Sequence, residues 1–255
     1  MTLPGGKFDL TSFATAEELA RAVASKWLDE IETAQRAGKP HCVALSGGRI
    51  SQKFFASFVG QAEAREIGGG DTSSLPGNVH FFWADERCVP PDDPESNFKM
   101  ANELLFTPLK VPPGQIHRIR GEDAPSVAVK IAESELRQIA PPGESNLPVL
   151  NLVFLGMGED GHVASLFPSA PAEVLHCAAP FLAIENSPKP PPRRISLSYA
   201  AVAAARQVWV LISGAGKELA LRASLGSEAK TPLGRVFQMR QKTLIFSQIE
   251  VDKKI

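Results

Sequence analysis

The chain has 255 residues, of which 44% are hydrophobic and 22% are charged, and its formal net charge is −1. This length is enough for one sizeable core and does not demand a second domain, so we expect a single domain over residues 1–255. The near-neutral charge gives no basic footprint for nucleic acid or for an anionic membrane surface. No apolar run approaches the roughly 20 residues that span a bilayer, so we expect neither partner.

The N-terminal segment and the cysteines indicate the compartment. Residues 1–10 lack both the basic region and the apolar region of a secretory signal. Cys42, Cys88 and Cys177 are far apart and odd in number, which fits neither a disulfide framework nor a zinc ligand pair. We therefore expect reduced thiols in a cytoplasmic protein.

The first predicted element is a long amphipathic helix over residues 16–37. Thr15 and Glu18 have the spacing of a capping box, and apolar side chains then recur at helical intervals. The apolar run 41–45 predicts a buried strand, residues 46–48 a turn, and residues 52–59 a second helix.

The same alternation recurs further along the chain. It predicts strands at 79–83, 149–155, 181–184 and 208–212, helices at 97–106, 125–139 and 217–225, and a surface loop at 68–77. Apolar strands that alternate with amphipathic helices are typical of an α/β fold with a parallel sheet covered on both faces. Ligands of such sheets bind beyond the carboxyl ends of the strands, so the loops that follow the strands are the candidate sites.

Two of these loops are rich in glycine. Ser46, Gly47 and Gly48 lie between a strand and a helix, where backbone N–H groups and the helix N-terminus favour an anion. The segment 213–217 could bring Lys217 and further amides to a phosphate. Each pattern fits a tight surface turn equally well, so both interpretations stay open.

The loop after residue 83 carries Asp85, Glu86 and Arg87. Arg87 could hold a carbonyl oxygen or a developing oxyanion, because guanidinium keeps its charge and offers planar donors. A surface ion pair followed by a helix N-cap at Ser96 explains the same residues equally well.

The loop from Gly156 to His162 matches GxGxxG after a strand, a dinucleotide-binding pattern. Its position in mid-chain, the histidine directly after the last glycine and Pro168 weigh against that interpretation, since the proline would cut short the helix beneath a pyrophosphate. The alternative is an acid–base group. Imidazole titrates near neutrality, and Asp160 could orient the ring and raise its basicity.

Four segments in chain order, 44–48, 82–90 with 96–97, 155–168 and 187–194, together resemble the 6-phosphogluconolactonase family. The resemblance covers most of the chain. It implies a three-layer α/β/α sandwich with a mainly parallel, Rossmann-like central sheet. It also implies hydrolysis of 6-phospho-D-glucono-1,5-lactone to 6-phosphogluconate, the second step of the oxidative pentose phosphate pathway, by a monomer without metal or cofactor.

The resemblance also implies roles for individual residues. Ser46, Gly47 and Gly48 fall on the phosphate loop, Arg194 and Lys217 at phosphate-binding cations, and Arg87, Asp160 and His162 at the lactone end. The candidate substrate-binding positions are completed by Asp85, Asn97, Gly158 and Arg49. Many family members have Ser or Thr at the position of Arg49, so Arg49 either adds a phosphate contact or points away.

A δ-lactone is an activated ester, so its hydrolysis requires neither a metal nor a covalent nucleophile. We expect His162 to take a proton from water, Asp160 to position the ring, and Arg87 or backbone amides to stabilise the oxyanion, at about 3 kcal/mol per donor. Ser46 and Ser165 do not lie in GxSxG, which favours water as the attacking group.

Three other functions fit parts of the pattern. Glucosamine-6-phosphate deaminase shares the fold, but its family carries an acid after the histidine and an aromatic after the acid pair. Residues 164–168 contain no acid here, and Arg87 takes the aromatic position. A nicotinamide-dependent oxidoreductase and a non-catalytic sugar-phosphate sensor are the remaining alternatives.

Overall fold

The computed structural model describes residues 2–5, 7–65, 75–143, 146–226, 228 and 230–250, with the backbone alone for 2–5. Most of the loop expected at 68–77 lies outside these residues. A central sheet of seven strands has the order β1-β2-β10-β9-β6-β3-β4. Its strands are β1 (Thr2–Gly5), β2 (Phe8–Ser12), β3 (His41–Leu45), β4 (Val79–Trp83), β6 (Leu152–Gly156), β9 (Gln207–Ile212) and β10 (Thr243–Ser247).

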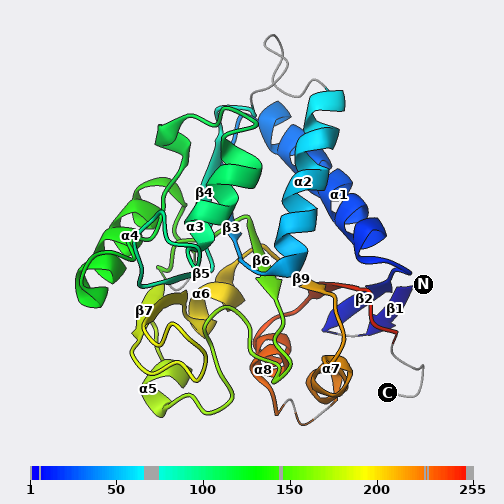
Figure 1. Ribbon diagram of the computed structural model, residues 1–255, viewed down its shortest axis with the longest axis vertical. Helices are drawn as coiled ribbons and strands as arrows, with labels where there is room; N and C mark the ends of the chain where they lie inside the picture. The colour runs from blue at the N-terminus through cyan, green and yellow to red at the C-terminus, as the bar shows by residue number, and fades with distance from the viewer. Residues whose placement is uncertain are drawn as a thin grey trace.

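This sheet is parallel apart from β1, which pairs antiparallel with β2. Helices α1 and α2 lie above it in Figure 1 and α7 and α8 lie below it. The predicted class, a three-layer α/β/α sandwich around a mainly parallel sheet, is confirmed. Strands β3 and β4 have the predicted bounds.

A second, three-stranded sheet has the order β5-β8-β7 and is antiparallel throughout. Its strands are β5 (Asp85–Arg87), β7 (Phe181–Ile184) and β8 (Arg194–Leu197). The strand predicted at 181–184 therefore forms, but its assignment to the parallel alternation was wrong. The following segment has no crossover helix and returns directly as β8, and such a short connection favours antiparallel pairing.

The predicted helices form with shifted ends. The helix expected at 52–59 begins at residue 49 and ends at 64, and the one expected at 97–106 continues from an α-helix into a π-helix. The helices are α1 (Ala16–Arg36), α2 (Arg49–Ala64), α3 (Asn97–Ala101), the π-helix Asn102–Phe106, the 3-10 helix Pro113–Gln115, α4 (Pro125–Ile139), α5 (Ala172–Leu175), α6 (Tyr199–Ala204), α7 (Glu218–Leu225) and α8 (Pro232–Met239). The elements β1, β2, β5, β8, β10, α5, α6 and α8 were not predicted.

Aromatic packing fixes α1 and α2 on the sheet. The Trp27 ring lies 4.2 Å from the Phe58 ring of α2 and 5.1 Å from Phe154 of β6. The indole Nε1 of Trp27 donates to Nε2 of His41, 3.2 Å away, so the buried ring keeps a hydrogen-bond partner. Each fully buried side chain of this size stabilises the fold by roughly 1.5–3 kcal/mol, and α2 is thereby held with its N-terminus at the edge where β3 ends.

Among the described residues, no helix is both long and apolar enough to cross a bilayer. Cys42, Cys88 and Cys177 are all free thiols, as predicted.

Candidate active site

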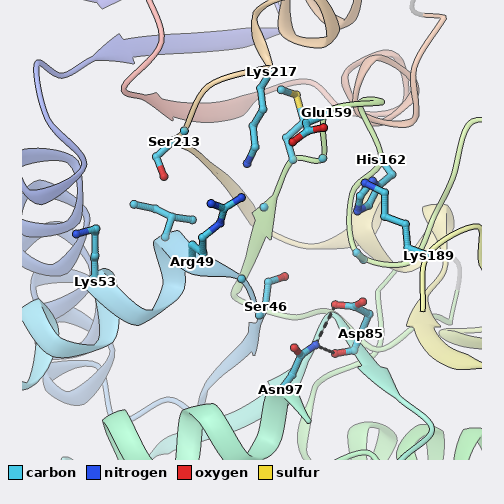
Figure 2. A pocket seen from close by; sticks show the side chains of 18 of the residues that line it. Ser46, Arg49, Lys53, Asp85, Asn97, Glu159, His162, Lys189, Ser213 and Lys217 are labelled. Carbon is cyan, nitrogen blue, oxygen red and sulfur yellow. Dashed lines mark hydrogen bonds between the residues drawn. The ribbon is translucent and has the colours of Figure 1, made fainter. Parts of the chain in front are cut away.

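A cavity of about 670 Å³ opens at the carboxyl edge of the parallel sheet (Figure 2). The loops that follow β3, β4, β6 and β9 all reach it, because parallel strands end at one common edge. Its lining residues are Ala16, Ser46, Gly47, Gly48, Arg49, Ile50, Lys53, Asp85, Arg87, Asn97, Gly156, Met157, Gly158, Glu159, His162, Ala164, Lys189, Arg194, Ser213, Gly214, Ala215, Lys217 and Gln248.

The lining concentrates positive charge in a chain that is nearly neutral overall. Six cationic side chains face two carboxylates, namely Arg49, Lys53, Arg87, Lys189, Arg194 and Lys217 against Asp85 and Glu159. Such an excess in a partly enclosed space attracts an anionic ligand. Among the described residues, no group of three or more His, Cys, Asp or Glu side chains is placed to hold a metal ion.

The N-terminus of α2 forms one wall of the cavity. Gly48 is its N-cap with φ of +102°, a value that favours glycine, and no side chain caps the helix. A Cβ on Gly47 would lie 1.9 Å from Oδ1 of Asn97, so only glycine fits beneath that amide. The open first turn leaves backbone N–H groups directed at the cavity, an arrangement that binds anions.

Arg49 and Lys217 meet beside this helix terminus, where Figure 2 shows the guanidinium directed towards the lysine. Burial lowers the pKa of Lys217, the charge of Arg49 lowers it further, and Glu159 opposes the shift. Two cations that raise each other's energy in this way form a strong site for an anion between them. Arg49 lines the cavity and so does not point away from it, and its contact with a phosphate stays a prediction.

His162 and Asp160 form a close pair at the other side of the cavity. Nδ1 of His162 lies 2.5 Å from Oδ1 of Asp160, and the imidazole is only 17% exposed. Burial lowers the pKa of His162 and outweighs the raising effect of the carboxylate. The carboxylate fixes the tautomer in which Nδ1 carries the proton, so Nε2 is left as the free acceptor.

The loop around this pair depends on glycine. A Cβ on Gly158 would lie 2.1 Å from both Cε1 and Nδ1 of His162, so Gly158 acts by giving the ring room. The amide of Gly158 donates to the carbonyl of His162 at 2.9 Å, which closes the loop.

The glycine loop is not followed directly by a helix. After Gly161 the next helix is α5, which starts only at Ala172. The dinucleotide interpretation is therefore wrong, because no helix terminus follows the glycines.

Asp85 and Asn97 form the floor of the cavity (Figure 2). Nδ2 of Asn97 donates to the carbonyl of Asp85 at 2.9 Å, and the Ser165 hydroxyl donates to Oδ2 of Asp85 at 2.6 Å. The Ser46 hydroxyl donates to the carbonyl of Phe154 at 2.8 Å. Both serine hydroxyls are thus engaged in buried hydrogen bonds.

Glu86 organises the start of α3, a function that the sequence analysis missed. Its carboxylate accepts the backbone amides of Asn97 and Phe98 at 2.8 and 2.7 Å and the Ser96 hydroxyl at 3.1 Å. Burial raises the pKa of Glu86 to about 7, against these hydrogen bonds. Ser96 is also the N-cap of α3, so that part of the structural alternative is confirmed.

Arg87 forms the ion pair of the structural alternative and also reaches the cavity. Its Nη1 donates to the carbonyl of Glu95 at 2.6 Å and lies 3.5 Å from the Glu95 carboxylate. The predicted surface ion pair is therefore present, and Arg87 also lines the cavity. Its Nε is buried and has no hydrogen-bond partner among the described residues.

Arg194 is 4% exposed and lines the cavity. Its Nε donates to the carbonyl of Pro191 at 3.0 Å, and its Nη2 donates to that of Pro190 at 2.9 Å. Burial lowers its pKa, and the charges that act on it include Asp85 and Arg87. The structure therefore brings Arg49 and Lys217 together, and the charges of Asp85 and Arg87 act on Arg194 in the same cavity. Whether Arg194 binds a phosphate stays a prediction.

Several lining residues were not among the predicted site residues, namely Lys53, Glu159, Lys189, Ser213 and Gln248. Lys189 had a signal in the sequence. It lies in the segment 187–194, where four prolines restrict φ and make a stiff arm that could direct its cations. For Gln248, which follows β10, the sequence carried no comparable signal.

The family of the chain follows from comparison with known proteins. The model for glucosamine-6-phosphate isomerases/6-phosphogluconolactonase matches residues 14–246. The chain belongs to this family. A family member in Mycobacterium tuberculosis, named 6-phosphogluconolactonase, is 35% identical over 219 residues, which cover 84% of each chain. A Streptomyces coelicolor member of that name is 33% identical and covers 82% of this chain and 79% of its own length.

Solved structures of the family have the same architecture. The structure of 6-phosphogluconolactonase from Thermotoga maritima has a TM-score of 0.76 and 27% identity, and the match covers 94% of this chain and 98% of that one. The Trypanosoma brucei enzyme of that name has a TM-score of 0.80 and 25% identity, over 94% and 95%. A monomeric glucosamine-6-phosphate deaminase has a TM-score of 0.75 at 16% identity, a likeness of fold alone.

Proposed function

We propose that the chain hydrolyses 6-phospho-D-glucono-1,5-lactone to 6-phosphogluconate. The observation that carries this proposal is one cavity with a His162–Asp160 pair on one side and Arg49, Lys217 and the α2 N-terminus on another. A base and an anion site in one space fit a phosphorylated substrate with a hydrolysable bond. The names of the family members at 33–35% identity support the same reaction.

In the proposed mechanism, Nε2 of His162 takes a proton from a water molecule whose oxygen attacks C1 of the lactone. The C1 carbonyl electrons move to oxygen and form a tetrahedral oxyanion. When the carbonyl re-forms, the bond between C1 and the ring oxygen breaks, and His162 returns its proton to that oxygen. Asp160 holds the ring in the required tautomer and stabilises the imidazolium that forms between the two proton transfers.

Water, rather than a serine, is the proposed nucleophile. The Ser46 hydroxyl donates to a backbone carbonyl and the Ser165 hydroxyl to Asp85, so neither has His162 as a proton acceptor. A serine nucleophile needs such a base within hydrogen-bond reach. A δ-lactone is activated enough for attack by water without a metal, and we propose a metal-free reaction.

Arg49, Lys217 and the amides of Gly47 and Gly48 are the proposed phosphate clamp. The phosphate lies far from the bond that breaks, so its binding energy serves to fix C1 over the base. Arg87 and Arg194 are the proposed electrophilic partners on the lactone side, since both line the cavity beside Asp85. Their unbonded guanidinium N–H groups are available to a developing oxyanion.

The test is a lactonase assay of the wild type and of His162→Ala. Hydrolysis is measured above the spontaneous rate, with 6-phosphogluconate detected by a coupled dehydrogenase. We expect His162→Ala to fold normally and to lose activity by roughly 10²–10⁴-fold, the usual contribution of a general base. A wild-type rate no faster than buffer contradicts the function. A normal rate in the folded variant contradicts only the role of His162.

A further inference from the structure

Lys189 is a cavity-lining cation that the mechanism above does not use. Its Nζ lies 3.8 Å from Oδ1 of Asp160. The same oxygen lies 2.5 Å from Nδ1 of His162. One carboxylate oxygen is thus shared by an imidazole and an ammonium group, and Figure 2 shows Lys189 and His162 on the same side of the cavity.

The backbone of Lys189 is held in place. Its carbonyl accepts the Ser187 hydroxyl at 2.8 Å and Nη2 of Arg194 at 3.1 Å, and its amide donates to the Ser187 hydroxyl at 3.2 Å. Pro188 and Pro190 on either side restrict φ. The side chain, which is 44% exposed, therefore starts from a fixed point next to Asp160.

We propose that Lys189 is a positioning residue, whose ammonium group holds Oδ1 of Asp160 against the imidazole and keeps His162 in its neutral, proton-accepting form. This inference rests on the proposed function, in which His162 is the base. Arg194 supports the arrangement indirectly, because it holds the carbonyl of Lys189.

The charges around His162 explain why a cation is useful here. Asp160 and Asp85 favour the protonated ring, while burial, the largest effect, and Lys189 lower the pKa of His162. The neighbouring Phe167 ring, 4.7 Å away, carries no charge. Asp160 alone would favour an imidazolium, which cannot take a proton from water. The ammonium group offsets part of that charge and leaves the orienting hydrogen bond in place.

The experiment compares three variants of the full chain. Lys189→Met removes the charge and keeps the apolar stem, whereas Lys189→Arg keeps the charge. Lys53→Met is the matched control, because Lys53 lines the same cavity but pairs with Glu17 instead of Asp160. Two quantities are measured from about pH 5.5 to about pH 8. They are kcat/KM above the spontaneous rate, and the NMR titration of the His162 ring, assigned by its loss in His162→Gln.

In Lys189→Met we expect the His162 titration and the acid limb of kcat/KM to move together to higher pH. The rate near pH 6 then falls roughly threefold, the size of effect that a partly exposed ion pair produces, and the deficit narrows near pH 8. Lys189→Arg and Lys53→Met keep the wild-type midpoint. An unchanged His162 titration in Lys189→Met, or an equal shift in Lys53→Met, overturns the inference.

The NMR titration needs no substrate, so it distinguishes this inference from the proposed function. A wild type that does not hydrolyse the lactone would contradict the function and leave the titration result standing.

Discussion

Two arginines of the cavity have different surroundings, and we expect different roles for them. Arg49 points at Lys217 beside an uncapped helix terminus. Arg194, by contrast, is buried and donates to backbone carbonyls of the proline-rich segment. Nε and Nη2 of Arg194 are accepted by these carbonyls, so Arg194 has fewer donors left for a ligand than a guanidinium that faces open space. The geometry therefore favours Arg49 and Lys217 as the main phosphate ligands.

This difference is testable with paired substrates. Arg49→Ala and Lys217→Ala are expected to weaken binding of the phosphorylated lactone by roughly tenfold or more each, since hydrogen bonds to a charged group contribute about 1.5–3 kcal/mol. They should leave the unphosphorylated lactone nearly unaffected. KM, or inhibition by 6-phosphogluconate against gluconate, provides the measurement.

Arg194→Ala belongs in the same comparison, because the family resemblance predicts that Arg194 also binds the phosphate. That prediction requires a selective loss for the phosphorylated lactone. Equal losses for both substrates would contradict that prediction and agree with the proposed place of Arg194 on the lactone side. A wild-type response in Arg49→Ala would remove Arg49 from the phosphate clamp.

At the scale of elements, β5 connects the two sheets at the cavity, because it follows β4 of the central sheet after one residue and Asp85 and Arg87 line the cavity. The sequence showed Asp85, Glu86 and Arg87 as a loop, but they form a strand that pairs with β8. A strand of three residues has too short a pattern to be recognised by its alternation. Its partner strand lies more than 100 residues away in the chain, so only the folded chain reveals the pairing.

Glu86→Ala is expected to destabilise the protein by about 2–3 kcal/mol. The amides of Asn97 and Phe98 and the Ser96 hydroxyl would lose their acceptor. Ser96→Ala, which removes only the N-cap hydroxyl, is expected to cost about 1 kcal/mol. Urea unfolding of both variants measures the two values. Equal stability of Glu86→Ala and wild type would show that the carboxylate does not hold α3.

At the scale of the whole molecule, burial of a few titratable groups couples stability to pH. Burial lowers the pKa of His41 to about 4, with Nε2 accepting the Trp27 indole N–H. His117, which packs between β4 and α4, has its pKa lowered to about 4 as well, by burial and then by His80. Glu86 acts in the opposite direction, since its pKa is raised.

The consequence for His41 has a definite sign. The folded state keeps the ring neutral, whereas the unfolded chain binds a proton below about pH 6.5. Its contribution is complete above that pH and is lost as the pH falls towards about 4, by at most about 3 kcal/mol. We therefore expect His41→Gln to flatten the decline of the unfolding free energy between these values.

Urea unfolding at a series of pH values measures this slope in wild type and variant. His176→Gln, at an exposed histidine, is the matched control and should keep the wild-type slope. Parallel curves for His41→Gln and wild type would contradict a buried neutral imidazole.

The fold of the molecule does not by itself decide the reaction. A glucosamine-6-phosphate deaminase has the same architecture at 16% identity, and shared folds carry different chemistries. The residues next to His162 distinguish the lactonase from the deaminase. Val163, Ala164 and Ser165 follow His162 without the acid of the deaminase pattern, and the Ser165 hydroxyl donates to Asp85.

The amino-acid sequence by itself determined the alternation of strands and helices, the loops that form the cavity, and the pairing of His162 with Asp160. These depend on periodicity, glycine placement and residues two positions apart, which are local properties of the chain. The tertiary structure alone decided that β7 joins a separate antiparallel sheet, that backbone carbonyls of residues 189–191 hold Arg194, and that Lys189 reaches Asp160. Each of these depends on which distant segments pack together, and packing is set by burial and hydrogen bonding over the whole chain.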